Sequence, residues 1–315
     1  MSLMPGVNYS WLDTIILKLI NVLFFIDKVI SKLFNFKPFS KINYLNCKKE
    51  SIIFSKLDES YKKVAAYDPK NNVNPNVIWT AWFQGIDAAP SLVKICIESF
   101  SKLKGYDVII ITLKNYNQYV TLPQEIIDKF NNGIIGYTAF SEIIRIELLS
   151  IYGGIWMDST VYIHKAIEET LLEKEFLTLK GVEKLRPGKH LGLIPVYFIG
   201  CESNYPPILK VRDYLLSYWI HNDKQIDYFL IDYCFKLVVC NDADFSRYMN
   251  AHPLNGIDRF KLIELMNTPY NEIIKNEIDK CNCGAFKLSN KYKLKTRSSK
   301  GKDTFWGHIL KHRAL

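Results

Sequence analysis

Short apolar runs alternate with segments of helical spacing between residues 77 and 218. Val77–Trp79 and Asp107–Thr112 are apolar runs of the kind typical of strands buried on both faces of a parallel sheet. Ser91–Lys102 lies between them, and its apolar residues recur every three to four positions, as in a helix. The order strand, helix, strand predicts a right-handed crossover unit, which we interpret as the nucleotide-binding half of an α/β fold.

The same patterns predict further elements along the chain. We expect helices over Pro123–Phe130, Thr138–Ser150, Glu168–Glu175 and Pro206–Tyr218, and strands over Phe176–Leu179 and Val196–Gly200. Strands and helices that alternate in this way are typical of α/β proteins. The fold class that we predict is therefore α/β, with a Rossmann-like sheet covered by helices.

A strongly apolar segment runs from Trp11 to Phe36, but charged residues interrupt it, so we do not expect it to span a bilayer. Its pattern predicts an amphipathic helix with a wide apolar face and lysines on the margin of that face. Such a helix suits a membrane interface with anionic lipid. The alternative is a helix docked on the protein's own surface or in a homo-oligomer. We therefore expect an N-terminal helical segment, residues 1–50, and a main domain, residues 51–315.

Composition and charge narrow the class of protein but do not choose its partner. The chain has 315 residues, 48% of them hydrophobic, and can bury a full core. Its formal charge of +9 indicates anionic partners, such as nucleic acid, an acidic membrane surface or a sugar nucleotide. No helix-turn-helix, RNA-recognition or zinc pattern supports nucleic acid, so we expect none as a partner. Seven scattered cysteines and no secretory signal indicate a reduced, cytosolic setting.

Asp158 is the most informative single residue, because it interrupts an apolar strand run from Ile155 to Ile163. Gly153 and Gly154 precede this run and can bring the chain from a helix into a strand at close quarters, since glycine accepts positive φ. A buried carboxylate costs several kcal/mol unless it is paired, hydrogen-bonded or coordinated. Asp158 therefore indicates a ligand site at a strand end. The alternative is an ordinary turn in which Asp158 caps the next segment.

Ser141, Glu142 and Arg145 share one face of the helix predicted before the two glycines. Arg145 offers five N–H donors in a fixed geometry, and Glu142 offers acceptors. Near Asp158, this face can hold a hydroxylated or phosphorylated ligand. The alternative is an intrahelical pair of Glu142 and Arg145, worth a few tenths of a kcal/mol.

Two motifs together carry a resemblance to a known family. Ala139–Arg145 and Tyr152–Val161 resemble the signature of the capsular polysaccharide synthesis glycosyltransferases, relatives of the Asp-x-Asp sugar transferases that include mannosyltransferases and clostridial glucosylating toxins. The resemblance extends over residues 75–240 and more loosely to Leu294. It implies a GT-A-type fold, a nucleoside-diphosphate sugar donor such as a UDP-sugar, a glycan or lipid-linked glycan acceptor, and retention of the anomeric configuration.

The resemblance also implies a divalent cation, Mn²⁺ or Mg²⁺, which absorbs the charge of the leaving diphosphate. It places the metal at Asp158 and Thr160. Thr160 stands where the Asp-x-Asp relatives carry a second acid, and a hydroxyl is a weaker metal ligand than a carboxylate. Glu142 stands where the family usually has Asp, so its carboxylate is displaced by one methylene.

Three further regions take roles from the resemblance. The pattern around Trp79 and Trp82 matches that of the family and predicts a nucleotide base stacked on Trp79, with core packing as the alternative. Asp227 lies in an aromatic segment where an acid of the family can face the sugar, or it caps a helix. The basic stretch from Lys287 to Leu315 either closes over the donor diphosphate or forms a solvated tail.

We expect a glycosyltransferase of capsular or other cell-surface polysaccharide synthesis, cytoplasmic and peripheral on the inner face of the cell membrane. The expected catalytic residues are Asp158, Glu142, Arg145 and Asp227, and the expected donor-binding residues are Trp79, Trp82, Ser141, Arg145 and Asp158. The alternative from a different class is a non-catalytic, membrane-associated assembly protein that keeps the transferase fold.

Overall fold

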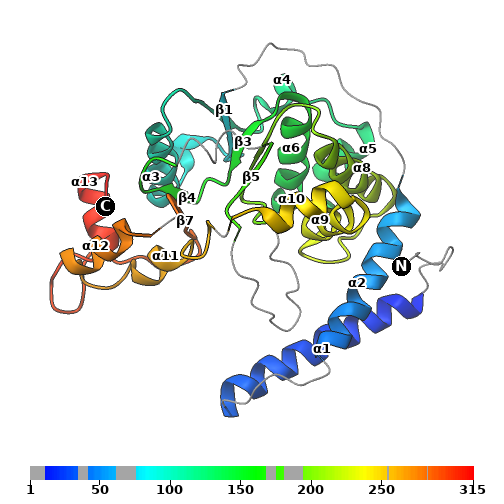
Figure 1. The fold of residues 1–315 in the computed structure, drawn as a ribbon, viewed down its shortest axis with the longest axis horizontal. Helices are drawn as coiled ribbons and strands as arrows, with labels where there is room; N and C mark the ends of the chain where they lie inside the picture. The colour runs from blue at the N-terminus through cyan, green and yellow to red at the C-terminus, as the bar shows by residue number, and fades with distance from the viewer. Residues whose placement is uncertain are drawn as a thin grey trace.

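A central sheet of five strands, in the order β2-β1-β3-β6-β5, organises the fold (Figure 1). The computed structural model describes residues 11–34, 42–61, 76–167, 175–180, 194–253, 255–281 and 283–315. The strands are β1 (Val77–Ala81), β2 (Asp107–Ile111), β3 (Gly154–Met157), β5 (Phe176–Thr178) and β6 (Phe198–Cys201). Each of them lies on an apolar run that the sequence predicts as a strand. The helix predicted over Glu168–Glu175 falls, except for its last residue, outside the described residues.

The sheet is parallel in one half and antiparallel in the other. β1 pairs in parallel with β2 and with β3, which confirms the predicted crossover. β6 pairs antiparallel with both β3 and β5. Because β1 and β3 run side by side in the same direction, their last residues, Ala81 and Met157, lie at one edge of the sheet. In open α/β sheets this carboxyl edge is where ligands bind.

Helices cover both faces of the central sheet (Figure 1). One face is covered by η1 (Ile86–Ala88), α3 (Ser91–Ser99) and η2 (Phe100–Lys102). The opposite face is covered by α6 (Tyr137–Tyr152), α8 (Pro206–His221), α9 (Leu230–Asn241) and α10 (Ala243–Ala251), with α4 (Tyr116–Tyr119) and α5 (Gln124–Asn131) before α6. The helices predicted near residues 91–102, 123–130, 138–150 and 206–218 are thereby confirmed.

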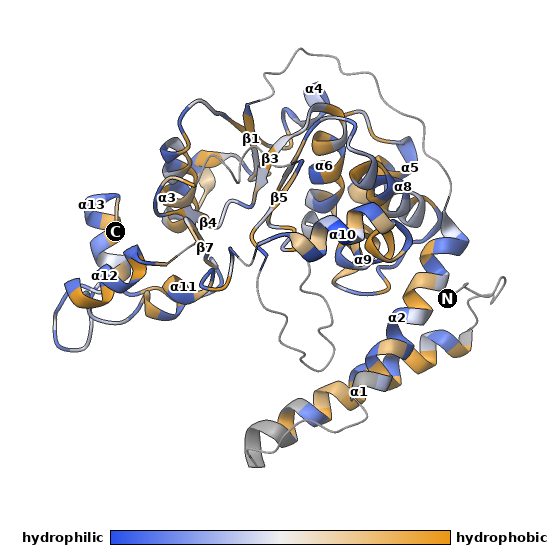
Figure 2. Cartoon of the chain, in the orientation of Figure 1, coloured by the Kyte–Doolittle hydropathy of each residue, from blue (hydrophilic) through white to orange (hydrophobic). Residues whose placement is uncertain are grey.

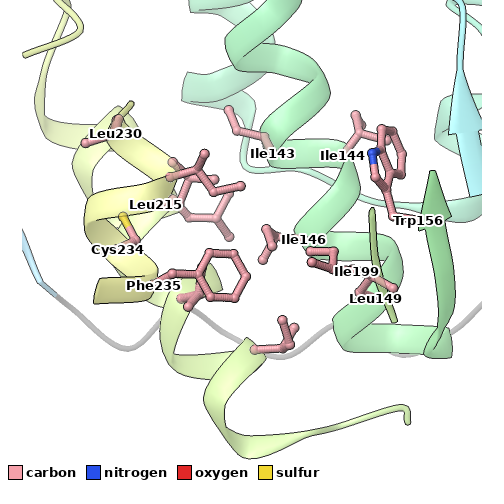
Figure 3. Packing of buried hydrophobic residues seen from close by; sticks show 14 of the residues in the cluster. Ile143, Ile144, Ile146, Leu149, Trp156, Ile199, Leu215, Leu230, Cys234 and Phe235 are labelled. Atoms are coloured by element: carbon pink, nitrogen blue, oxygen red, sulfur yellow. The ribbon is translucent and has the colours of Figure 1, made fainter. Parts of the chain in front are cut away.

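The main hydrophobic core lies between α6 and its neighbours (Figure 3). Ile143 and Ile146 of α6 face Leu215 of α8 and Phe235 of α9, while Trp156 of β3 closes the core on the sheet side. Burial of one such side chain contributes about 1.5–3 kcal/mol. α6 is therefore held in place from both the helical layer and the sheet, and so are the polar residues that it carries.

A second, smaller sheet pairs β4 (Val161–Ile163) antiparallel with β7 (Ala285–Lys287). The apolar residues before and after Asp158 therefore form two strands in two sheets, because the chain leaves the central sheet at Asp158. The expectation of a single strand from Ile155 to Ile163 is therefore wrong.

The C-terminal part of the chain packs around this second sheet. α11 (Lys261–Leu265), α12 (Glu272–Asp279) and α13 (Phe305–His312) share a core with Tyr162 and Phe286. Phe305 and Trp306 are buried in the same core. The end of the chain from Phe305 on is therefore packed against the domain, and for this part the interpretation as a solvated tail is wrong. The basic residues between positions 291 and 302 are exposed, as that interpretation expects.

Two long helices, α1 (Trp11–Phe34) and α2 (Ile42–Ser60), precede the sheet and extend from the side of α8 and α9 (Figure 1). α2 continues across residue 50, where the sequence suggested a boundary. Ion pairs of 2.6 Å attach it to the main domain, from Lys49 to Asp227 and from Glu50 to Lys236.

α1 contacts α2 along a narrow stripe that includes Ile20 and Phe24. Outside this stripe α1 carries many exposed apolar side chains. Orange segments of the ribbon in Figure 2 mark the apolar residues of this helix. The exposed apolar residues are Leu12, Ile15, Leu19, Val22, Leu23, Phe25, Ile26 and Val29. Within the described residues, no helix combines the length and the apolar character needed to cross a membrane.

Candidate functional site

The turn between α6 and β3 sets the geometry of the site. Gly153 and Gly154 have φ of 66° and 85°, and a Cβ on either would lie within 2.7 Å of backbone oxygens of neighbouring strands. Trp79 Nε1 donates a hydrogen bond of 2.9 Å to the carbonyl of Gly153. Only glycine combines this positive φ with such a close approach. The turn therefore places the end of α6 directly beside the sheet.

A cavity of about 1330 Å³ lies at the carboxyl edge of β1 and β3. Its wall includes Ser141, Glu142 and Arg145 from α6, Asp158 and Thr160 after β3, Trp82 after β1, and Asp232 from α9. The sequence predicts the first six of these as site residues, and the structure brings them together around one cavity.

Asp158 is the electrostatic centre of this wall. Its Oδ1 accepts hydrogen bonds of 2.9 Å from Arg145 Nη2 and from Trp156 Nε1, and its Oδ2 accepts one of 2.7 Å from Lys287 Nζ. Burial alone would raise the pKa of Asp158, but Lys287 and Arg145 outweigh it and lower the pKa below its ordinary value. Asp158 is therefore ionised, and the role of a simple turn-capping residue does not describe it.

Lys287 is placed by the pairing of β4 with β7, in which it lies opposite Val161. Its Nζ donates to Thr160 Oγ1 at 2.7 Å as well as to Asp158. The same ammonium lies 5.1 Å from the centroid of the Tyr197 ring. Lys287 does not form the cavity wall but lies against the two residues that do.

Arg145 has hydrogen-bond donors that no described residue accepts from. Its Nη2 pairs with Asp158, and its guanidinium lies 4.9 Å from the centroid of the Trp156 ring. Its Nε and Nη1 are buried and have no hydrogen-bond partner within the described part of the chain. A buried donor without a partner costs about 1–3 kcal/mol, so these N–H groups indicate a ligand. The alternative of a pair between Glu142 and Arg145 is wrong, because the ion pair of Arg145 is with Asp158.

Two carboxyl groups of the wall have raised pKa values. Burial raises the pKa of Glu142 to about 8, against the lowering effect of Arg145. Burial likewise raises the pKa of Asp232 to about 7, and Arg145 again counteracts it. Oε2 of Glu142 has no hydrogen-bond partner among the described residues. At pH 7 Glu142 is therefore mostly protonated and can both donate and accept a hydrogen bond.

Trp79 is not part of the cavity wall, which corrects the stacking role predicted for it. Its side chain is fully buried, packed between Tyr119 and Tyr152 and hydrogen-bonded to Gly153. The ring has no face left for a nucleotide base. Trp82, three residues later, does line the cavity, and its Nε1 is buried without a partner among the described residues.

Asp227 also lies outside the cavity wall. It forms an ion pair of 2.6 Å with Lys49 of α2, and its Oδ1 accepts a hydrogen bond of 2.9 Å from the backbone N–H of Phe229. Asp227 thus stabilises the turn before α9. This role resembles the alternative stated for it, in which Asp227 caps a helix. Asp232, five residues later on the first turn of α9, is the acid of this segment that reaches the cavity.

The side-chain oxygens of Asp158 and Thr160, where the resemblance places a metal ion, have another cation beside them. Lys287 Nζ lies 2.7 Å from both Asp158 Oδ2 and Thr160 Oγ1. Mg²⁺ is usually held by one or two carboxylates together with waters and substrate phosphates, so it needs a carboxylate oxygen that is free to coordinate it. Across the described ranges, no group of three or more His, Cys, Asp or Glu residues is arranged to hold a metal ion. Lys287 bonds Asp158 Oδ2 and Thr160 Oγ1, and Arg145 and Trp156 bond Asp158 Oδ1. With these partners in place, Asp158 and Thr160 do not fit a divalent cation.

Sequence reasoning missed Lys287, Asp232 and Trp156. Lys287 follows two apolar residues of a short strand, so no local pattern distinguishes it from the other lysines of the basic C-terminal stretch. Asp232 offered a weak signal, because it is an acid within the apolar face of a helix. Trp156 lies in a motif that the sequence did single out, but its hydrogen bond to Asp158 depends on the chain turning after β3.

The fold and the cavity define an α/β protein with a charged candidate ligand site at the carboxyl edge of its sheet. A family model described as capsular polysaccharide synthesis protein matches residues 30–309, and the chain belongs to this family. Among solved structures, the chain is similar to one titled PaToxG Glycosyltransferase, with 18% sequence identity and a TM-score of 0.38. That match covers 66% of this chain and 82% of the other. No curated protein sequence matches the chain.

Proposed function

We propose that this protein is a glycosyltransferase that moves a sugar from a nucleoside-diphosphate donor to a glycan or lipid-linked glycan acceptor. The observation that carries the proposal is Arg145, whose Nε and Nη1 are buried in the cavity wall without a partner among the described residues. The oxygens of a diphosphate match such a planar fork of donors. Family membership supports a role in capsular polysaccharide synthesis.

The charges of the site suit the departure of a diphosphate. Cleavage of the bond between the sugar and the diphosphate leaves negative charge on the latter, and fixed cations stabilise that charge. Arg145 and Lys287 both pair with Asp158, so this group of three carries more positive than negative charge. Glu142, with a pKa raised by burial to about 8, can hydrogen-bond a sugar hydroxyl in its neutral form.

The rest of the wall suits the remaining parts of a nucleotide sugar. Trp82 and Tyr228 offer aromatic rings to the cavity, and Tyr228 is 62% exposed. Stacking of a base on such a ring contributes about 1–3 kcal/mol. We infer a uridine donor, a GT-A-type arrangement of the sheet and retention of configuration from the resemblance in the two motifs around Arg145 and Asp158.

α1 supports a peripheral location on the inner face of the cell membrane. Its exposed apolar side chains lie outside the stripe that packs on α2. A helix of this kind lies in the interface between headgroups and acyl chains, where lysines such as Lys18 attract anionic lipid. A lipid-linked acceptor would be presented at the same surface.

The proposal is tested with purified protein and a panel of nucleotide sugars. We expect hydrolysis of at least one of them, and Asp158→Asn should lower kcat by about 100-fold or more. Asp244→Asn, an exposed residue of α10, is the matched control and should retain full activity. Binding of no nucleotide sugar and no nucleoside diphosphate, by a protein shown to be folded, would favour the non-catalytic assembly protein instead.

A further inference from the structure

We propose that Lys287 supplies the positive charge that a divalent cation would supply at Asp158 and Thr160, so that donor binding needs no metal. This inference rests on the proposed function, because it concerns the diphosphate end of the same cavity. It departs from the metal dependence that the sequence predicts for Asp158 and Thr160.

The contacts of the ammonium carry the first step. Lys287 Nζ is 2.7 Å from Asp158 Oδ2 and 2.7 Å from Thr160 Oγ1. Both distances are typical of hydrogen bonds to a charged donor. The two oxygens therefore converge on one cationic nitrogen, as they would converge on a metal ion in the Asp-x-Asp pattern.

The backbone fixes this cation in place. Lys287 lies opposite Val161 in the pairing of β7 with β4, and its N–H donates a hydrogen bond of 2.7 Å to the carbonyl of Arg259. The N–H of Leu288 donates one of 2.8 Å to the carbonyl of Thr160. Because strand pairing sets the register, the backbone of Lys287 is held at a fixed position beside Asp158 and Thr160.

The local charge completes the argument. Asp158 pairs with Arg145 as well as with Lys287, so one positive charge remains in excess around this carboxylate. A divalent cation at Asp158 would meet repulsion from both basic groups. An anionic diphosphate in the cavity would be attracted by the same excess charge. Lys287 acts from behind the wall, with 20% of its side chain exposed.

Titration of the protein alone with Mn²⁺ gives the first readout, which does not depend on any nucleotide. We expect no saturable Mn²⁺ binding by the wild type up to about 1 mM, the range of weak protein sites. Lys287→Gln should gain a Mn²⁺ site, because it releases the two oxygens, and the added substitution Asp158→Asn should remove it. A Mn²⁺ site in the wild type that Asp158→Asn abolishes would overturn the inference.

Calorimetry with UDP and with GDP gives the second readout, in EDTA and in Mn²⁺. Wild-type affinity for the nucleotide that binds should agree within about threefold in the two conditions. Lys287→Gln should bind about tenfold more weakly in EDTA and recover in part with Mn²⁺. Lys287→Arg keeps the charge and should stay close to wild type. Lys293→Gln, an exposed lysine of the same basic stretch, should change nothing.

The outcomes separate the two proposals. Nucleotide binding by the wild type only in the presence of Mn²⁺ overturns the role of Lys287 and leaves the proposed transferase intact. Failure of both nucleotides to bind under either condition counts against the proposed function, and the Mn²⁺ titration then decides the inference alone. If Lys287→Gln leaves the UDP affinity unchanged and gains no Mn²⁺ binding, the proposed role of Lys287 is also overturned.

Discussion

Lys287 Nζ lies 2.7 Å from Asp158 Oδ2, although 129 residues separate the two in the chain. The contact exists because β7 returns from the C-terminal part of the chain to pair with β4. It explains how a carboxylate stays ionised in a setting where burial raises its pKa, since Lys287 and Arg145 together lower that pKa. The second sheet thereby completes a site whose other residues lie on α6, on α9 and after the ends of β1 and β3.

Arg145→Lys should weaken UDP binding by about tenfold or more, because lysine keeps the charge but loses the planar fork of donors. The change is measured by calorimetry. Arg247→Lys, an exposed arginine of α10, is the matched control and should leave the affinity unchanged. Wild-type affinity in Arg145→Lys would assign Arg145 a purely structural role as the partner of Asp158.

Glu142→Gln should make stability less dependent on pH. Burial raises the pKa of Glu142 from 4.5 to about 8, so the folded protein keeps a proton that the unfolded chain releases above pH 4.5. Wild-type stability therefore falls as pH rises between these values, by at most about 1.4 kcal/mol per pH unit from this residue. The advantage of Glu142→Gln over wild type should grow through this window and level off above pH 8.

Denaturant unfolding at a series of pH values between 5 and 9 measures this difference. Asp232, whose pKa burial raises to about 7, contributes in the same direction to both proteins and largely cancels. Glu125→Gln, at an exposed position of α5, is the control and should follow the wild-type curve. Parallel curves for Glu142→Gln and wild type would contradict a raised pKa at Glu142.

Gly154→Ala should destabilise the fold by about 2–4 kcal/mol, because strain from positive φ adds to a backbone clash. Its Cβ would lie 2.7 Å from the carbonyl oxygen of Val77. Gly133→Ala separates the two effects, since Gly133 has a φ of 74° and no atom within 4 Å of its Cβ position. Gly133→Ala should lower the free energy of unfolding by only about 1–2 kcal/mol. Equal losses in the two variants, measured by denaturant unfolding, would show that close approach at Gly154 does not matter.

The double substitution Val22→Glu and Phe25→Glu should reduce binding to anionic vesicles by about tenfold or more. Both side chains are exposed on α1, at 53% and 67%. Phe24 is unsuitable, because it packs between α1 and α2. Binding of the wild type should also weaken with salt, since lysines contribute to it. Co-sedimentation with vesicles that contain phosphatidylglycerol provides the measurement.

Tyr44→Glu places a charge at an exposed aromatic residue of α2 and is the control for the vesicle experiment. It should bind vesicles as the wild type does. Equal binding by the double variant and the wild type would reject the membrane role of α1. Loss of a dimer in the double variant, seen by light scattering, would instead assign the apolar surface of α1 to contact between two copies of the chain.

The sequence by itself determined the elements that carry local patterns. Apolar runs placed all five strands of the central sheet, and helical spacing placed α3, α6 and α8 within a few residues. The two glycines at the start of β3 and the acid after it located the end of the strand where the cavity lies. These features follow from periodicity and from the conformational freedom of glycine, which act over a few residues and can be read without knowledge of the fold.

Only the tertiary structure decided which side chains meet at that edge. Trp79 and Trp82 look equivalent in the sequence, yet the hydrogen bond to Gly153 and the burial of β1 place Trp79 in the core. Asp227 and Asp232 look equivalent too, but the position of α2 gives Asp227 a lysine partner far along the chain. Lys287 has no local signal at all. Contacts between distant segments depend on how sheets and helices pack, and a local pattern carries no information about the partner that packing will supply.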